Sequence, residues 1–143
     1  MKTFLAASLL VAGLTLSAAE AAPIEMTMYK NPQCECCTGH AAYLERNGFK
    51  VKVVPTEDLE RIKHMAGIPE DLEGCHTIMV GGYVVEGHVP AAPIKKLLAE
   101  KPKVKGIALA GMPMGSPGMG GTKTGPFTIH AFGNGKVSVF AVE

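Results

Sequence analysis

The sequence has no tryptophan, only three tyrosines and no surplus of either charge, since 14 lysines and arginines face 13 aspartates and glutamates. This balance argues against a basic face for nucleic acid. With 17 glycines and 10 prolines among its 143 residues, the chain is typical of a small, loop-rich globular protein rather than a coiled coil or a disordered segment. The length excludes a second full catalytic domain.

Long apolar runs are also missing, apart from one near the start of the chain. Lys2 precedes this run, and small residues follow it up to Ala22. The order is typical of a secretory signal peptide cleaved near Ala21 or Ala22, because the run is too short for a membrane anchor. We therefore expect residues 1–22 to be a signal peptide, residues 23–143 to be exported to the periplasm, and no membrane span to remain after cleavage.

Hydrophobic periodicity divides residues 24–100 into a series of strands and helices. The strands are expected at 24–29, 49–54, 77–80 and 83–86, and the helices at 36–47, 57–66 and 90–100. The order strand, helix, strand, helix, strand, strand, helix resembles the thioredoxin fold. It predicts an α/β protein with a mixed sheet and flanking helices, folded as a single metal-binding domain over residues 23–143.

The last part of the chain, residues 101–143, forms an extension to this core. Its segment 106–126 is rich in glycine, methionine and proline and is predicted to be a loop without regular structure. Two apolar runs, 127–132 and 137–142, flank the turn Gly133–Lys136. The Asn-Gly pair in that turn favours a β-hairpin.

The four cysteines fall in two places. Cys34, Cys36 and Cys37 form a CxCC motif between the first predicted strand and the first helix, and Cys75 lies just before the third strand. A helix start favours thiolate over thiol, because its unpaired N–H groups and its dipole stabilise negative charge. In a thioredoxin-like fold the segment of Cys75 packs against this turn, so we expect the four sulfur atoms to converge.

Three chemistries remain open for these cysteines. The first is a pair of stabilising disulfides, for which Cys34–Cys37 and Cys36–Cys75 are the reasonable partners. The second is a thiol–disulfide oxidoreductase that uses Cys34 and Cys37, although Cys36 interrupts its motif and the usual cis-proline beside the motif is missing. The third, a soft-metal site, is favoured because clustered thiolates select Cu(I), zinc or iron–sulfur centres.

Among these metals, copper suits the spacing best. Tetrathiolate zinc normally takes its ligands from two spaced pairs, whereas the CxCC motif would crowd its three sulfurs around a single ion. Crowded thiolates can bridge several monovalent ions instead. One Cu(I) per thiolate would cancel the charge of the cluster and reduce the free energy needed to bury it. We therefore expect a cysteine-bridged cluster of several Cu(I) ions.

Four segments resemble a known family. They are Asn31–Cys37, Pro69–Thr77, Gly82–Pro90 and Gly111–Met119. In these segments the chain is similar to the CopG-type family of small exported proteins associated with bacterial copper resistance. The resemblance implies a thioredoxin-like fold and copper redox chemistry between Cu(I) and Cu(II). It also implies a multinuclear copper site, whose matching ligands are Cys34, Cys36, Cys37 and Cys75.

Histidines are candidates for a further role at this site. His88 lies just before the last predicted helix and is a candidate outer ligand or proton carrier. His40 could share the helix face of Cys36, or it could be an exposed polar residue of that helix. His76 follows Cys75 and should point the other way if the segment is extended.

Methionines are the other candidates. Glycines flank Met112, Met114 and Met119, so the 106–126 loop could act as a flap that folds over the cysteines and brings thioethers to copper. The alternative is that these methionines fill gaps in the core. We name Met112 and Met114 as candidate ligands.

The sequence thus predicts a periplasmic copper-binding protein that is redox-active and serves copper resistance. Its partners would be copper ions and another periplasmic copper-handling protein, and not nucleic acid. Two alternatives remain, a thiol–disulfide oxidoreductase using Cys34 and Cys37 and a redox-inactive copper chaperone. Whether the protein is an enzyme, as a copper oxidoreductase would be, stays open.

Overall fold

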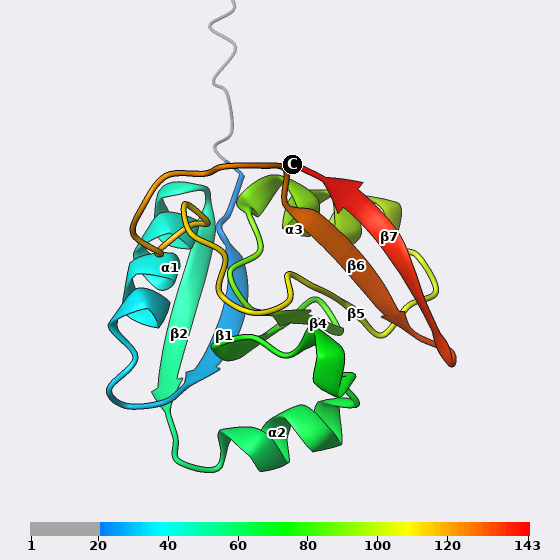
Figure 1. Cartoon of the computed structure of the whole chain (residues 1–143), viewed down its shortest axis with the longest axis horizontal. Helices are drawn as coiled ribbons and strands as arrows, with labels where there is room; N and C mark the ends of the chain where they lie inside the picture. The colour runs from blue at the N-terminus through cyan, green and yellow to red at the C-terminus, as the bar shows by residue number, and fades with distance from the viewer. Residues whose placement is uncertain (1–20) are drawn as a thin grey trace, which may run out of the picture.

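A computed structural model describes residues 21–143, so the expected signal peptide lies outside the described residues except for its last two positions. The described chain forms one mixed sheet with three α-helices packed beside it (Figure 1). No helix in this part of the chain has the length and apolar composition that a membrane crossing requires.

The order of the elements matches the prediction over residues 24–100. The elements are β1 (Ile24–Lys30), α1 (Glu35–Arg46), β2 (Phe49–Pro55), α2 (Leu59–Ala66), a short 3-10 helix η1 (Glu70–Leu72), β3 (His76–Val80), β4 (Tyr83–Glu86), α3 (Ala91–Glu100), β5 (Gly106–Ala108), β6 (Thr128–Gly133) and β7 (Lys136–Val142). The α/β class with a mixed sheet and flanking helices is confirmed.

The strands lie in the order β2-β1-β3-β4-β5-β6-β7. β1 is parallel to β2 and β4 is parallel to β5, while the other neighbours are antiparallel. The helix α1 makes the crossover that a parallel pair requires. Gly81 and Gly82 connect β3 to β4 with φ angles of 55° and 84°, the positive values that a two-residue hairpin turn needs.

The strand β5 lies where the sequence analysis expected no regular structure. It pairs with β4 on one side and β6 on the other, and so joins the C-terminal hairpin to the main sheet. A side chain at Gly106 would collide with the backbone of Val84 and the ring of Phe132, so glycine permits this close pairing. The expectation for residues 106–126 was therefore wrong at its first three positions, whereas the hairpin of β6 and β7 is confirmed.

The sheet buries side chains on both faces. On one face, Leu44 of α1 and Ile94 of α3 are fully buried and belong to the main core with Val85. The neighbouring Val84 points to the opposite face, because successive strand residues alternate. There it joins a smaller cluster that includes Leu72 of η1.

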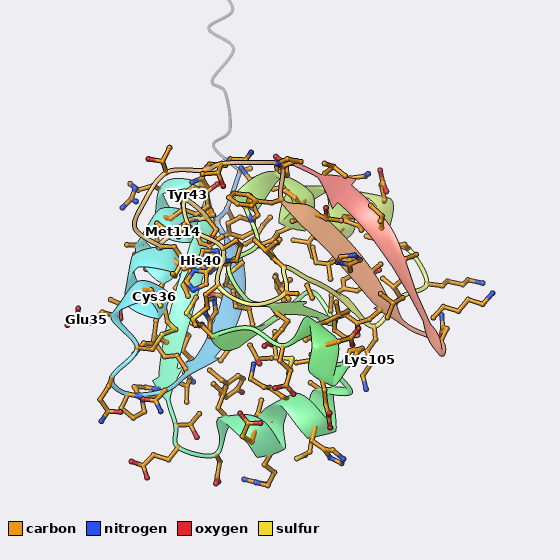
Figure 2. The ribbon with its side chains drawn as sticks, in the orientation of Figure 1. Glu35, Cys36, His40, Tyr43, Lys105 and Met114 are labelled. Atoms are coloured by element: carbon orange, nitrogen blue, oxygen red, sulfur yellow. A yellow bond between two sulfur atoms is a disulfide. The ribbon has the colours of Figure 1, made fainter. Side chains whose placement is uncertain are left out.

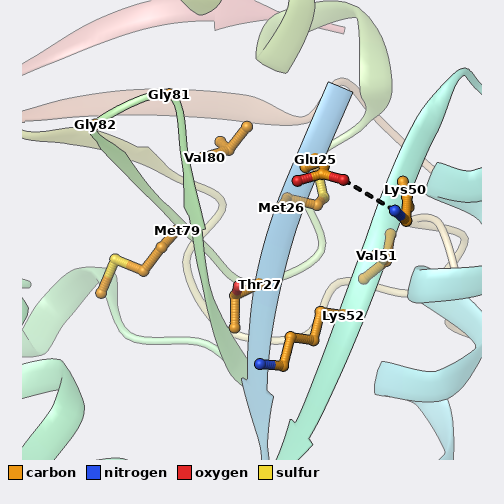
Figure 3. Close-up of a pocket in the computed structure, with 10 residues that line it drawn as sticks. All are labelled: Glu25, Met26, Thr27, Lys50, Val51, Lys52, Met79, Val80, Gly81 and Gly82. Carbon is orange, nitrogen blue, oxygen red and sulfur yellow. Dashed lines mark hydrogen bonds and ion pairs between the residues drawn. The ribbon is translucent and has the colours of Figure 1, made fainter. Parts of the chain in front are cut away.

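A pocket lies beside the first half of β1 and the turn between β3 and β4 (Figure 3). An exposed ion pair between Lys50 and Glu25, with 2.9 Å between Nζ and Oε1, borders it. The pocket is lined by Glu25, Met26, Thr27, Lys50, Val51, Lys52, Met79, Val80, Gly81 and Gly82. The cysteines lie beyond the other end of β1, so this pocket is separate from the candidate site.

Candidate metal centre

The pairing of β1 with β3 brings the two cysteine segments together. Lys30, the last residue of β1, is the register partner of His76, the first residue of β3. The CxCC turn directly follows β1, and Cys75 directly precedes β3. Segments separated by about forty residues in the sequence therefore meet at one end of the sheet.

The four Sγ atoms lie within 4.8 Å of one another, as the sequence analysis expected. Cys36 is central, with its Sγ 3.4 Å from that of Cys34 and 3.6 Å from that of Cys75. Cys37 is completely buried, while the other three are partly exposed. Cys34 occupies the residue before α1, and its neighbours lie in the first turn of that helix.

Two of the four sulfurs are joined to each other. Cys34 and Cys37 form a disulfide, whereas Cys36 and Cys75 are free thiols. Of the two bridges considered from the sequence, one is therefore present. Burial, followed by the neighbouring Cys36, raises the pKa of the Cys75 thiol to about 12. Four thiolates thus become available only after the disulfide is reduced and a metal displaces the thiol protons.

A buried ion pair holds residues on both sides of Cys75. Lys63 and Glu86 are paired with side chains 3% and 0% exposed. The Lys63 ammonium donates to the Gly74 carbonyl at 3.0 Å, and the Gly74 N–H donates to Glu86 Oε1 at 2.8 Å. Thr77 Oγ1 donates to Glu86 Oε2 at 2.6 Å. This pair could not be predicted, because nothing local in the sequence shows that two such distant charges meet.

Three histidines form a second group beside the cysteines. His40 comes from α1, His76 from β3 and His88 from the segment after β4, and all three are completely buried. Each has a ring nitrogen within 4.8 Å of those of the other two. Each of these residues was a separate candidate in the sequence, and their meeting was not predicted. His40 lies one turn beyond Cys36 along α1 (Figure 2).

Backbone carbonyls hold two of these histidines. His40 Nε2 donates to the Val89 carbonyl at 2.9 Å, and His88 Nδ1 donates to the Pro117 carbonyl at 2.7 Å. Burial lowers the pKa of His40 to about 3, with a further contribution from His88, and it also lowers the pKa values of His76 and His88. The three imidazoles are therefore neutral at pH 7.

The loop after β5 folds over both groups. Gly111 pairs with Gly74 beside Cys75, and its N–H donates to the Glu73 carbonyl at 3.0 Å. Gly118 packs so closely on the α1 backbone that a Cβ would lie 2.8 Å from the Cα of His40. The loop thus lies where the sequence analysis expected a flap.

Among the three loop methionines, Met112 is the one that the structure brings to the cysteines. Its Sδ lies 2.7 Å from the Sγ of Cys75. Met114 packs on Gly121 instead and is 63% exposed. Met119 is partly buried, with its N–H bonded to the Ser116 carbonyl.

Comparison with known proteins identifies a region that contains part of this site. A family model described as "Protein of unknown function, DUF411" matches residues 72–119, which include Cys75, two of the buried histidines and the methionine loop. Two solved structures, described as "Copper resistance protein copG" in Form 1 and Form 2, match with TM-scores of 0.78 and 0.79. Both are 37% identical to this chain, and each match covers 85% of this chain and 98% of the other.

The chain belongs to the CopG family of copper resistance proteins. No curated protein sequence matches it. In this CopG-family chain the donor atoms suit a soft metal ion, because thiolate and thioether sulfurs are soft ligands and five of them, with Met112 included, meet at one end of the sheet.

Proposed function

We propose that the protein binds several Cu(I) ions in a cluster bridged by its four cysteines and that it serves copper resistance in the periplasm. The proposal depends on one observation. The Sγ atoms of two distant segments, the CxCC turn and Cys75, lie within 4.8 Å of one another. The similarity to copper resistance proteins supports copper as the metal.

The spacing of the sulfurs supports a cluster rather than a single ion. Cys36 lies 3.4 and 3.6 Å from two other sulfurs, and thiolates this close repel one another unless cations lie between them. One Cu(I) for each thiolate makes the cluster neutral. Neutrality matters here because Cys37 is completely buried, and an uncompensated buried charge is strongly unfavourable.

The disulfide supports a redox role. The thiolates of Cys34 and Cys37 lose two electrons when they form this bond, and two Cu(II) ions that become Cu(I) would accept those electrons. A thiol reductant would then restore the two thiolates. We therefore propose that the protein interconverts Cu(I) and Cu(II), with the disulfide form as its oxidised state.

Met112 and His88 are proposed to assist from outside the sulfur cluster. Met112 would add a thioether ligand beside Cys75, where it would also cover the partly exposed side of the site. His88 contributes to the buried histidine group next to the cluster. Met114, which packs on Gly121, would bind copper only if the loop rearranged.

Metal analysis tests the cluster. Protein reduced and loaded with Cu(I) without oxygen should hold at least two copper ions per chain, and X-ray absorption should show Cu(I) with sulfur neighbours. A single copper per chain, or a preference for zinc when both metals are offered, would contradict the proposal.

A thiol–disulfide oxidoreductase is the second candidate, favoured by the Cys34–Cys37 disulfide at the start of a helix. Cys36→Ser separates the two functions because it leaves that disulfide intact. We expect this variant to lose copper and the metal-free parent to show no insulin reduction. If the parent and the variant both reduce insulin at the same rate, and the variant keeps the copper count of the parent, the oxidoreductase is favoured instead.

A copper chaperone without redox activity is distinguished by oxidation state. A protein that only delivers copper would take up and release Cu(I) with the disulfide unchanged. The redox proposal expects Cu(II) added to the reduced protein to be converted to Cu(I), seen as loss of the Cu(II) signal in electron paramagnetic resonance, together with the loss of two thiols per chain.

A further inference from the structure

We infer that His40, His76 and His88 form a second metal site, which binds one Cu(I) ion through imidazole nitrogens. This inference does not depend on the cysteine cluster, since it uses a different set of donor atoms. It rests on how the three rings are arranged and on which of their nitrogens lack a partner.

The three rings are grouped around a common point. Their centroids are separated by 4.9 Å between His40 and His76, 5.2 Å between His40 and His88, and 4.7 Å between His76 and His88. The rings come from three separate elements, and none is exposed to solvent. Neutral imidazole nitrogens are suitable ligands for copper.

The hydrogen bonds determine which nitrogens carry protons. A carbonyl oxygen can only accept, so His40 Nε2 and His88 Nδ1 must carry hydrogens toward Val89 and Pro117. In the neutral ring the other nitrogen has a lone pair. His40 Nδ1 therefore accepts a hydrogen bond from His76 Nε2, which lies 2.7 Å away.

Two lone pairs remain without a partner. They belong to His76 Nδ1 and His88 Nε2, and both atoms are buried without a hydrogen bond in the structure. A buried polar atom of this kind normally binds a partner, and a metal ion supplies one. A ring rotation at His76 would release the lone pair of His40 Nδ1 as the third donor.

The surroundings favour a monovalent ion. The three ligands are neutral, and the nearby ammonium groups of Lys30 and Lys63 repel added positive charge, although Lys63 is paired with Glu86. The free energy needed to bury an ion rises with the square of its charge, so Cu(I) incurs only about a quarter of the penalty of Cu(II) or zinc. The charges around the site therefore favour Cu(I) over a divalent ion.

A variant without cysteines isolates this site. We expect the full chain with Cys34, Cys36, Cys37 and Cys75 all changed to serine to bind one Cu(I) per chain, delivered without oxygen from a chromophoric Cu(I) chelator. X-ray absorption should show nitrogen neighbours and no sulfur. A folded variant, judged by its amide NMR dispersion, that takes no Cu(I) from the chelator would overturn the inference.

Histidine variants in the same background locate the ion. His88→Gln should weaken Cu(I) binding at least tenfold, whereas His64→Gln, which changes an exposed histidine of α2, should leave it unchanged. Equal losses from both changes, or no loss from either, would contradict the assignment.

If these variants do not fold, a measurement on the unsubstituted protein tests whether the three histidines bind copper. Cu(I) is diamagnetic, so ¹⁵N NMR of the histidine rings remains readable when copper is bound. Copper in excess of the cysteine cluster should shift the signals of His76 Nδ1 and His88 Nε2 away from those of unprotonated nitrogens. Unchanged signals would overturn the histidine site and leave the cysteine cluster untouched. Shifted histidine signals without sulfur ligation would support the histidine site and overturn the cysteine cluster.

Discussion

Glu86 is a completely buried carboxylate that is paired with Lys63 and accepts hydrogen bonds from Gly74 and Thr77. Burying an ion pair gives little net stability compared with an apolar pair of similar size, so stability alone does not account for it. The residues that it holds are Gly74, immediately before Cys75, and Thr77, two residues after it. We interpret the pair as a device that fixes the position of the fourth sulfur.

We predict that Glu86→Gln destabilises the protein by about 3 to 5 kcal/mol, because it leaves the Lys63 ammonium buried without a counter-charge. Urea unfolding measures this change. Glu25→Gln is the matched control, since it removes an ion pair with Lys50 whose side chains are 77% and 69% exposed. The control should cost far less stability than Glu86→Gln, because an ion pair in contact with water contributes little. Similar losses in both variants would contradict the role assigned to Glu86.

We predict that the metal-free protein becomes less stable as the pH falls below about 6.5, because the pKa of His40 is lower in the folded protein than in the unfolded chain. Its pKa is about 3 in the folded protein, lowered from 6.5 chiefly by burial. Between these values the unfolded chain binds more protons, so the free energy of unfolding decreases with falling pH. We expect His40 alone to remove about 2 kcal/mol between pH 7.5 and pH 5.

Substitution separates this effect from the titration of other groups. His40→Gln should be less stable than the parent at pH 7.5 but should lose less on going to pH 5, as measured by urea unfolding at both pH values. His64→Gln, at an exposed position, should keep the pH dependence of the parent. A His40→Gln protein with the parent's full pH dependence would show that the buried imidazole is not the cause.

At the scale of elements, the loop between β5 and β6 connects the two groups of donors. It pairs with Gly74 beside Cys75, contacts the first turns of α1 through Gly118 and accepts the His88 hydrogen bond through Pro117. Gly118 has a φ of 85° and is in contact with backbone atoms, so both its conformation and its lack of a side chain are needed there.

We predict that Gly118→Ala moves the loop away from α1 and destabilises the protein by about 1 to 3 kcal/mol, from steric overlap and a strained backbone. Hydrogen exchange in the loop and in the first turns of α1 should become faster. Gly120→Ala is the matched control two residues away, where an added Cβ meets no atom within 4 Å. Unchanged exchange in Gly118→Ala would show that the loop does not depend on this contact.

The elements that have strong local signals could be predicted from the sequence, and β5 could not. The Asn-Gly turn of the last hairpin and the Gly81–Gly82 turn each require positive φ angles, which glycine and asparagine reveal directly. The strand β5 has only three residues, preceded by a lysine-rich stretch and followed by glycine and proline. Its position depends on the edges that β4 and β6 offer, which no local pattern records.

At the scale of the whole molecule, the site also has parts that the sequence predicts and parts that it does not. The meeting of the CxCC turn with Cys75 could be expected, because in a thioredoxin-like fold the segment of Cys75 packs against that turn, and the pairing of β1 with β3 produces it. The meeting of His40, His76 and His88 could not, since it depends on the rotation of α1 and on the path of the chain after β4. The difference between Met112 and Met114 likewise depends on loop geometry.

Metal binding should stabilise the whole fold, because the ligands come from α1 and from the start of β3. With free ion a thousandfold above its dissociation constant, the gain is about 4 kcal/mol, and for a domain of this size Tm rises on the order of 10 °C. Silver is a suitable probe, since Ag(I) is a soft monovalent ion that does not reduce disulfides. We predict a larger rise in Tm for the reduced protein than for the disulfide form, and equal rises would contradict a four-sulfur site.

The disulfide between Cys34 and Cys37 has a consequence for physiology. A protein that loses two of its four cysteine donors when it is oxidised can carry less metal when oxidants are abundant. Cells relying on it would then need a supply of electrons in the same compartment to restore its capacity. Limiting that supply should make such cells sensitive to copper even though the protein itself is present and correctly folded.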